Sequence, residues 1–151
     1  MLAAPNEGPA SQRLRILVAE DDDDTRALLV EGLEDEGYRA VELEDGFELL
    51  DYLELSNRLV SRRLQPDLVL TDVQMPGRSG LDVLREARRQ GLTCPFIVIS
   101  AFADEGLRVA ARTLEPAYVL PKPFGLEEVV ALVARAVSRR GRSAPKHEGV
   151  P

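Results

Sequence analysis

Five short segments rich in Val, Ile and Leu recur along this chain, and a longer amphipathic stretch follows each of them. Aliphatic runs of this length are typical of strands that are buried on both faces of a parallel sheet. The stretches between them carry apolar residues at helical spacing and often end at Gly. This alternation predicts an α/β fold, in which a five-stranded, doubly wound parallel sheet carries helices on both faces.

The chain of 151 residues is long enough for one such domain. The expected strands cover 15–19, 38–43, 67–71, 95–100 and 117–120. The expected helices cover 24–36, a segment from 47 onward, 80–90, 104–114 and 125–138. We therefore expect a domain at 14–138 between a disordered leader at 1–13 and a disordered basic tail at 139–151, because both ends are rich in Gly, Pro and polar residues.

Composition narrows the class of protein. The formal net charge of -7 argues against general affinity for nucleic acid, so we expect no direct DNA binding. Cys94 has no second cysteine to pair with, and the residues before the first strand lack the apolar core of a signal peptide. No segment approaches the length of a membrane span. These features favour a cytoplasmic protein without membrane association.

Polar side chains follow the expected strands at the point where each strand ends. Glu20 and Asp21 follow the first strand, Asp72 the third, Ser100 ends the fourth, and Lys122 follows the fifth. The carboxyl ends of parallel strands lie at one edge of the sheet, where ligands bind in this fold class. Three carboxylates at that edge repel one another unless a positive charge lies among them. Their oxygen atoms are the ligands that Mg²⁺ prefers, so the sequence predicts a magnesium site.

The acidic run after the first strand has members with different expected roles. Runs of like charge prefer water, so we expect Asp22 and Asp23 to face solvent. Asp24 is expected to cap the helix that follows. A calcium-binding loop that begins at Asp21 is disfavoured, because Arg26 occupies the position where that loop requires glycine.

Four stretches of the chain together resemble the receiver domain of two-component response regulators. They are RILVAEDD (15–22), PDLVLTDVQMPGRSGLDVL (66–84), PFIVISA (95–101) and VLPKPF (119–124). They follow one another in the order and spacing of that family, and the resemblance covers about 14–138. It implies the flavodoxin-like (β/α)5 receiver fold, with strand order 2-1-3-4-5.

The resemblance also implies roles for single residues at the metal site. Asp72 is expected to be the phosphoacceptor. Asp21 and Asp72 are expected to bind Mg²⁺ directly together with the backbone carbonyl of Gln74, and Glu20 to act mainly through water.

Two further residues are implied to act on the phosphoryl group. Ser100 is expected to contact it and to report its presence. Lys122 is expected to pair first with Asp72 and then with a phosphoryl oxygen, and the peptide bond from Lys122 to Pro123 is expected to be cis.

The chain departs from the family pattern in several places, among them Glu115-Pro116, where the family usually has a Gly-Ala pair. The position that usually carries an aromatic switch residue holds Val119, with Tyr118 on the opposite face of the strand. The stretch 53–65 is longer than the second helix region usually needs and carries Arg58, Arg62 and Arg63. It is either an overlong helix with a solvated face or an extension that docks a partner.

The resemblance implies a single-domain response regulator that catalyses only its own phosphorylation and dephosphorylation. The residues after 138 are too few for a helix-turn-helix, and His147 makes a poor phosphodonor site in the tail. The donor is expected to be a sensor histidine kinase or a histidine phosphotransfer protein. We expect the signal to reach an unidentified protein target through the fourth helix, fifth strand and fifth helix, a face that could also hold a homodimer.

Three alternatives remain open at this stage. The domain could act as a shuttle in a multi-step phosphorelay, or as a receiver-like interaction module that is not phosphorylated. The third alternative starts from the residues Asp21 to Thr25, which match the DxDxT loop of haloacid-dehalogenase-like phosphatases. That reading makes Asp21 the nucleophile and leaves Asp72 without a role.

Overall fold

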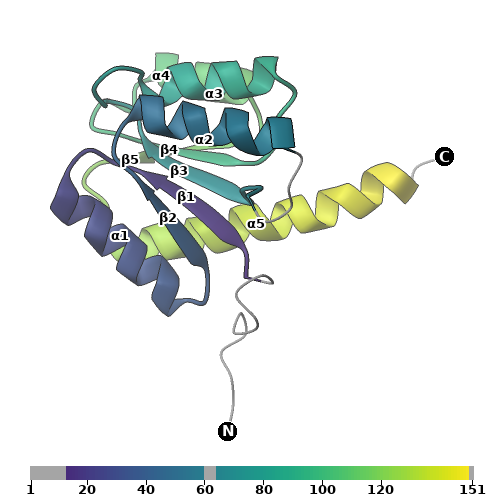
Figure 1. The fold of residues 1–151 in the computed structure, drawn as a ribbon, viewed down its shortest axis with the longest axis horizontal. Helices are drawn as coiled ribbons and strands as arrows, with labels where there is room; N and C mark the ends of the chain where they lie inside the picture. The colour runs from purple at the N-terminus through teal and green to yellow at the C-terminus, as the bar shows by residue number, and fades with distance from the viewer. Residues whose placement is uncertain (1–12, 60–63, 150–151) are drawn as a thin grey trace, which may run out of the picture.

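The computed structural model describes residues 13–59 and 64–149, and over these residues five strands alternate with five helices (Figure 1). The strands are β1 (Arg15–Ala19), β2 (Arg39–Leu43), β3 (Leu68–Asp72), β4 (Phe96–Ser100) and β5 (Ala117–Pro121). The helices are α1 (Asp23–Asp35), α2 (Gly46–Leu59), α3 (Gly80–Arg89), α4 (Glu105–Thr113) and α5 (Leu126–Gly149). All neighbouring strands are parallel and their order is β2-β1-β3-β4-β5, which confirms the predicted fold class and strand order.

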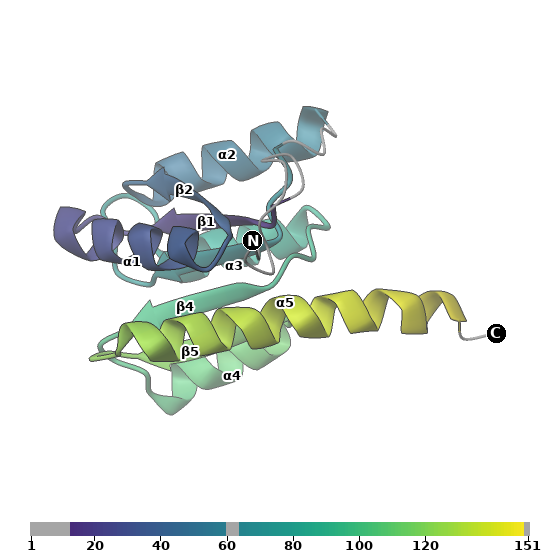
Figure 2. The same cartoon turned by 90° about the horizontal axis from the view of Figure 1, so that it is seen from below.

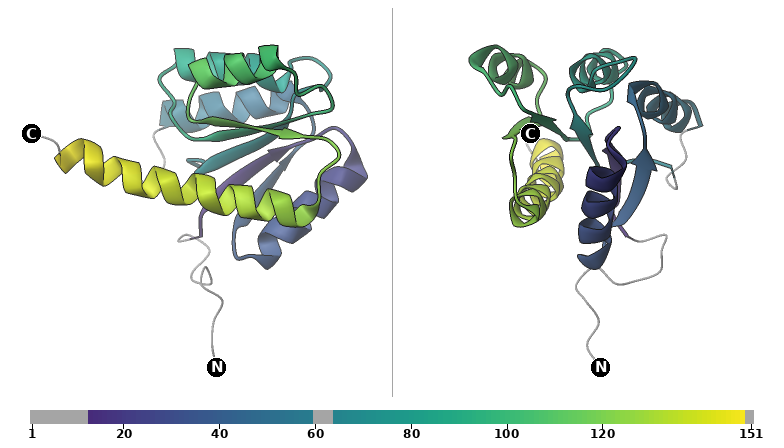
Figure 3. Two further views of the ribbon diagram at one scale, coloured as in Figure 1. Left: turned by 180° about the vertical axis from the view of Figure 1, so that it is seen from behind. Right: turned by 90° about the vertical axis from the view of Figure 1, so that its left-hand side faces the viewer.

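The helices form a layer on each face of the sheet. α1 and α5 cover one face, and α2, α3 and α4 cover the other (Figures 1 and 3). Successive residues of a strand point to opposite faces, so Ile16 and Val18 enter the core under α1 and α5, whereas Leu17 and Ala19 enter the other core. The central strands β3 and β4 are buried over their whole length, as their uninterrupted aliphatic sequences predict.

Two glycines let the backbone approach closely at the carboxyl edge of the sheet. A Cβ atom on Gly80 would lie 2.4 Å from the carbonyl oxygen of Asp72, and one on Gly46 would lie 1.9 Å from that of Arg78. Any larger residue would push α3 away from the end of β3, or α2 away from the loop after β3. These contacts fix the position of the loop that follows Asp72.

The start of α1 differs from the sequence prediction. The N-cap is Asp22, whose carboxylate accepts a hydrogen bond from the Thr25 backbone N–H, and the helix begins at Asp23. Asp24 lies in the first turn, so its assignment as the cap was wrong. Asp22 is exposed as expected, and Asp23, also exposed, forms an ion pair with Arg26. The sequence could not decide between adjacent aspartates, because each of them is a good cap residue.

The end of α5 also differs from the prediction. The helix continues to Gly149, past the boundary expected at 138, and extends beyond the sheet (Figure 2). The expectation of a tail without regular structure is therefore wrong for the backbone of 139–149.

Other predictions fall partly outside the described residues. Nearly all of the leader, residues 1–12, lies there, and so do Arg62 and Arg63. Arg58 is exposed in the last turn of α2. Tyr118 packs toward α1 and α5 and Val119 toward the other layer, as the alternation along β5 predicted. Among the described helices, none is both long enough and apolar enough to span a membrane.

Candidate functional site

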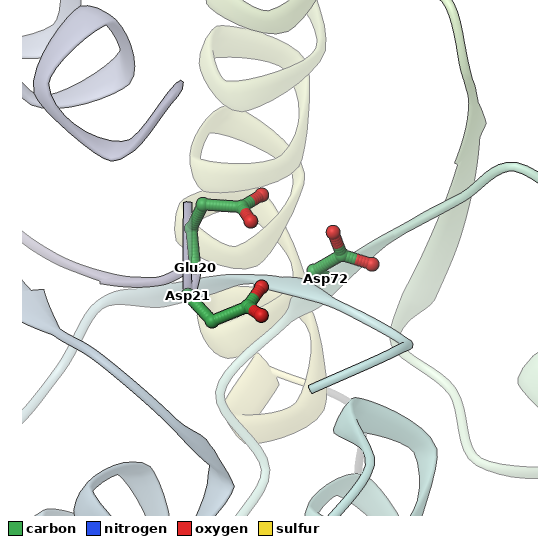
Figure 4. Close-up of side chains that lie close together, drawn as sticks. All are labelled: Glu20, Asp21 and Asp72. Atoms are coloured by element: carbon green, nitrogen blue, oxygen red, sulfur yellow. The ribbon is translucent and has the colours of Figure 1, made fainter. Parts of the chain in front are cut away.

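Three carboxylates meet at the carboxyl edge of the sheet. Glu20 and Asp21 directly follow β1, and Asp72 is the last residue of the neighbouring strand β3. One oxygen atom from each carboxylate can be chosen so that all three lie within 4.8 Å of one another. Figure 4 shows the side chains of Glu20 and Asp21 extending toward that of Asp72. The structure thus brings together the acidic residues that the sequence predicted as a metal site.

The cluster carries an electrostatic cost. Glu20 and Asp72 are only 2% and 3% exposed, whereas Asp21 faces solvent. Burial raises the pKa of the Glu20 carboxyl to about 7, and the negative charge of Asp72 acts in the same direction. A cation among these carboxylates would offset the cost of burying their negative charge.

Lys122 supplies a positive charge beside Asp72. Its Nζ atom lies 2.7 Å from Oδ2 of Asp72, as the resemblance implied. Burial alone would lower the pKa of Lys122, but its hydrogen bond to Asp72 and the nearby carboxylates outweigh burial and raise it. The ammonium group is therefore charged at neutral pH. The peptide bond from Lys122 to Pro123 is cis, as expected.

Backbone hydrogen bonds fix Ser100 and Gln74 at the carboxyl edge of the sheet. Ser100 is buried at the end of β4, where its Oγ atom accepts a hydrogen bond of 2.9 Å from Phe102 N–H. Its carbonyl accepts one of 2.8 Å from Lys122 N–H, which ties the ends of β4 and β5 together. The Gln74 N–H donates to Oδ1 of Asp72 at 3.0 Å. The role of the Gln74 carbonyl stays a prediction.

The residues present fit a hard divalent cation. One oxygen of Glu20 accepts a hydrogen bond from Asp22 N–H at 3.1 Å. The other, Oε1, is buried and has no hydrogen-bond partner among the residues that the structure describes. A buried carboxylate oxygen left without a donor is costly, and coordination by Mg²⁺ or by its bound water removes that cost. The cluster of Glu20, Asp21 and Asp72 offers only oxygen ligands, which Mg²⁺ prefers.

Sequence reasoning missed one residue next to this site. Arg26 is only 7% exposed and donates a hydrogen bond of 2.6 Å to the carbonyl of Glu20. A signal was present in the sequence, because Arg26 lies three and seven residues before Leu29 and Leu33 on the buried stripe of α1. An arginine on an apolar stripe indicates a buried partner.

Comparison with known proteins assigns the chain to a family. A sequence profile described as the response regulator receiver domain matches residues 16–134. The chain therefore belongs to the receiver domain family of two-component response regulators. Receiver domains are signalling modules of two-component phosphotransfer, and they generally use Mg²⁺ at an acidic pocket.

Individual relatives agree with this assignment. The chain is 38% identical to the alkaline phosphatase synthesis transcriptional regulatory protein SphR of Synechococcus elongatus, over 93% of this chain and 54% of SphR. It is 34% identical to the transcriptional regulatory protein PdtaR of Mycobacterium tuberculosis, over 92% of this chain and 64% of PdtaR. The non-phosphorylated HemR receiver domain of Leptospira biflexa superposes with a TM-score of 0.70 at 28% identity, over 83% of this chain and 95% of that one. The chain thus spans roughly half to two thirds of these two curated relatives.

Proposed function

We propose that this protein is a cytoplasmic response regulator that accepts a phosphoryl group on Asp72 from a sensor histidine kinase or a histidine phosphotransfer protein. The observation that carries the proposal is the position of the Asp72 carboxylate. It lies at the end of a central strand, 2.7 Å from the ammonium group of Lys122 and in one cluster with the carboxylates of Glu20 and Asp21. This arrangement combines a nucleophile, a fixed cation and a metal-binding cluster.

The transfer exchanges one bond to phosphorus for another. A carboxylate oxygen of Asp72 attacks the phosphorus atom of a phosphohistidine and forms an O–P bond. The P–N bond breaks, and the donor's imidazole nitrogen leaves with the electron pair and takes up a proton. Negative charge spreads over the three phosphoryl oxygens in the transition state, so the protein contributes chiefly positioning and neutralisation of charge.

The residues around Asp72 divide these tasks. Lys122 holds the carboxylate before transfer and can then pair with a phosphoryl oxygen, because its flexible stem lets the ammonium group follow the charge. Glu20, Asp21, Asp72 and the carbonyl of Gln74 would hold Mg²⁺. When bound, Mg²⁺ supplies a compact positive charge for the phosphoryl oxygens.

Phosphorylation would then change the partner-binding face. The phosphoryl group adds about two negative charges and three hydrogen-bond acceptors beside Ser100. We infer that the hydroxyl of Ser100 leaves the N–H of Phe102 for this new acceptor and moves the loop between β4 and α4. That movement shifts a two-state equilibrium on the surface of α4, β5 and α5. Val119 replaces the usual aromatic at this face, so packing of an aliphatic side chain would carry the change.

We further propose that residues 14–138 act by protein contact with a downstream target, as a stand-alone regulator. SphR and PdtaR are named as transcriptional regulators, so a role in gene expression is one use that such a contact could serve. A relay shuttle would use the same site but would pass the phosphoryl group on to a second histidine. Chase of the phosphorylated protein with candidate histidine phosphotransfer proteins distinguishes these two roles.

The test of phosphorylation is labelling by a small donor, followed by mapping of the label. The protein is incubated with acetyl phosphate and Mg²⁺, and the labelled residue is identified by mass spectrometry after borohydride trapping. We expect the label on Asp72, its loss in Asp72→Asn and its loss on removal of Mg²⁺ with EDTA. Asp24→Asn is the matched control, since it removes an exposed acidic charge outside the cluster and should label normally.

Two results would contradict the proposal. A label on Asp21 would favour the haloacid-dehalogenase-like alternative. Failure of the wild-type protein to label, both with acetyl phosphate and with active histidine kinases, would favour a receiver-like module that works without phosphorylation.

A further inference from the structure

Arg26 connects the acidic cluster to the structure around it. The guanidinium group extends from the first turns of α1 and uses all three of its nitrogen atoms as donors. Nη1 donates to the carbonyl of Glu20 at 2.6 Å, Nη2 to Asp23 at 2.6 Å, and Nε to Glu42 of β2 at 3.2 Å. The side chain is 9% exposed, whereas those of Asp23 and Glu42 are 85% and 55% exposed. The contact with the Glu20 carbonyl is therefore the buried end of this network.

The bond to Glu20 lies where the sheet ends. The register of β1 with β2 ends at the pair Ala19 and Leu43, and the Glu20 N–H still donates to the Leu43 carbonyl at 3.1 Å. The carbonyl of the same residue, Glu20, accepts a hydrogen bond from Arg26. The guanidinium thus supplies a fixed donor to the peptide between Glu20 and Asp21. The two residues that this peptide bond joins supply two of the three clustered carboxylates.

We propose that Arg26 is a positioning residue for the metal site. It fixes the peptide that joins Glu20 to Asp21, so that both carboxylates reach the cluster with Asp72. This inference rests on the proposed function, because it gives Arg26 a task at the magnesium site of the phosphorylation reaction. Arg26 itself contacts neither the metal ligands' side-chain oxygens nor the reacting carboxylate in the described contacts.

Positioning and charge predict opposite effects on metal affinity. Arg26 is a cation close to a site for another cation, so electrostatic repulsion alone would make Mg²⁺ bind more tightly when the charge is removed. If Arg26 acts by geometry, its removal frees the Glu20 peptide, and Mg²⁺ binds more weakly. The groups that orient metal ligands typically contribute about 10- to 100-fold to metal affinity. The sign of the change therefore separates the two roles.

The experiment is a Mg²⁺ titration of the unphosphorylated protein. Isothermal titration calorimetry measures Kd, and amide chemical shifts report binding and folding. It compares the wild type with Arg26→Gln, which removes the charge, and Arg26→Lys, which keeps the charge but loses the forked donor. We expect Kd to rise about 10-fold or more in Arg26→Gln and to rise by a smaller factor in Arg26→Lys. Glu42→Gln is the control, because it removes an outer partner of Arg26 and leaves the bond to Glu20; its Kd should stay within about twofold of the wild type.

Each outcome decides one question. An unchanged or lower Kd in Arg26→Gln, with a folded amide spectrum, would overturn the inference. If Arg26→Gln does not fold, Arg26→Lys decides: a raised Kd supports positioning, and a wild-type Kd overturns it. A wild-type protein that binds no Mg²⁺ would contradict the proposed function itself, whereas wild-type binding with unaffected variants contradicts only the role of Arg26.

Discussion

The two edges of the sheet differ in how their buried charges are paired. At the carboxyl edge, Glu20, Asp21 and Asp72 crowd together, and one buried oxygen of Glu20 has no donor among the described residues. At the amino edge, the guanidinium of the half-buried Arg88 lies over the ring of Phe96, 5.4 Å from its centre. It also donates hydrogen bonds of 2.7–2.9 Å to four backbone carbonyls, those of Leu92, Cys94, Leu114 and Pro116.

The difference separates a charge whose partners lie within the fold from a cluster that we propose binds a cation. Arg88 donates to carbonyls in the loops before β4 and β5, and that of Pro116 also accepts from Phe96 N–H, so Arg88 stabilises the fold as it stands. The repulsion within the acidic cluster falls when a cation binds among its carboxylates. A single domain therefore combines an amino edge whose buried charge is satisfied within the fold with a carboxyl edge that we propose responds to a bound cation.

The largest expected effect concerns Arg88. Replacing Arg88 by Met leaves four carbonyls without their charged donor, and we expect the free energy of unfolding to fall by about 4 kcal/mol. Urea denaturation measures this loss. Arg89→Met is the matched control on the same helix, because Arg89 is exposed and pairs only with Glu86 in the described contacts, so its loss should be much smaller. Equal losses in the two variants would contradict a structural role for the amino edge.

The next effect is the pH dependence of stability, which arises from Glu20. Its pKa is about 7 in the folded protein, against an ordinary value of 4.5. Between these values the folded state binds more protons than the unfolded state, so stability falls as pH rises and levels off above about pH 7. We expect Glu20→Gln to abolish this fall, which should be on the order of 2 kcal/mol.

Denaturation from about pH 5 to about pH 8 in the presence of EDTA measures the effect of Glu20. Glu31→Gln, an exposed carboxyl on α1, serves as the control and should keep the wild-type profile. If Glu20→Gln shows the same fall as the wild type, another group carries the pH dependence.

The smallest effect concerns Asp21. Replacing Asp21 by Asn relieves repulsion in the cluster, and without Mg²⁺ we expect a gain in stability of about 0.5 kcal/mol. Added Mg²⁺ should then raise the melting temperature of the wild type more than that of the variant, because the variant binds the ion less tightly. Asp24→Asn, which removes favourable charge from the first turn of α1, should instead be slightly destabilising. A gain of the same size in both variants would show that net charge, not the cluster, sets the effect.

The sequence predicted the strands and the metal cluster for reasons that are local. Aliphatic runs such as Ile16 to Ala19 fix a buried parallel strand, and parallel strands place whatever follows them at a common edge. The sequence therefore predicted that Glu20, Asp21, Asp72 and Lys122 lie together, as the structure shows. The family motifs supplied the strand order and the cis peptide bond, which no pattern of hydrophobicity encodes.

Tertiary structure decided which groups the buried arginines meet. Helical spacing placed Arg26 on the buried stripe of α1, but the sequence does not say which backbone carbonyls Arg26 and Arg88 contact once the strands end. The cap of α1 at Asp22 is a local contact, but adjacent aspartates are equally good cap residues, so the sequence did not choose between them. Sequence determined the pattern of strands and the carboxylates at their ends, because those follow from neighbours along the chain. The fold decided how the remaining polar groups are satisfied, because hydrogen-bond partners are set by packing in three dimensions.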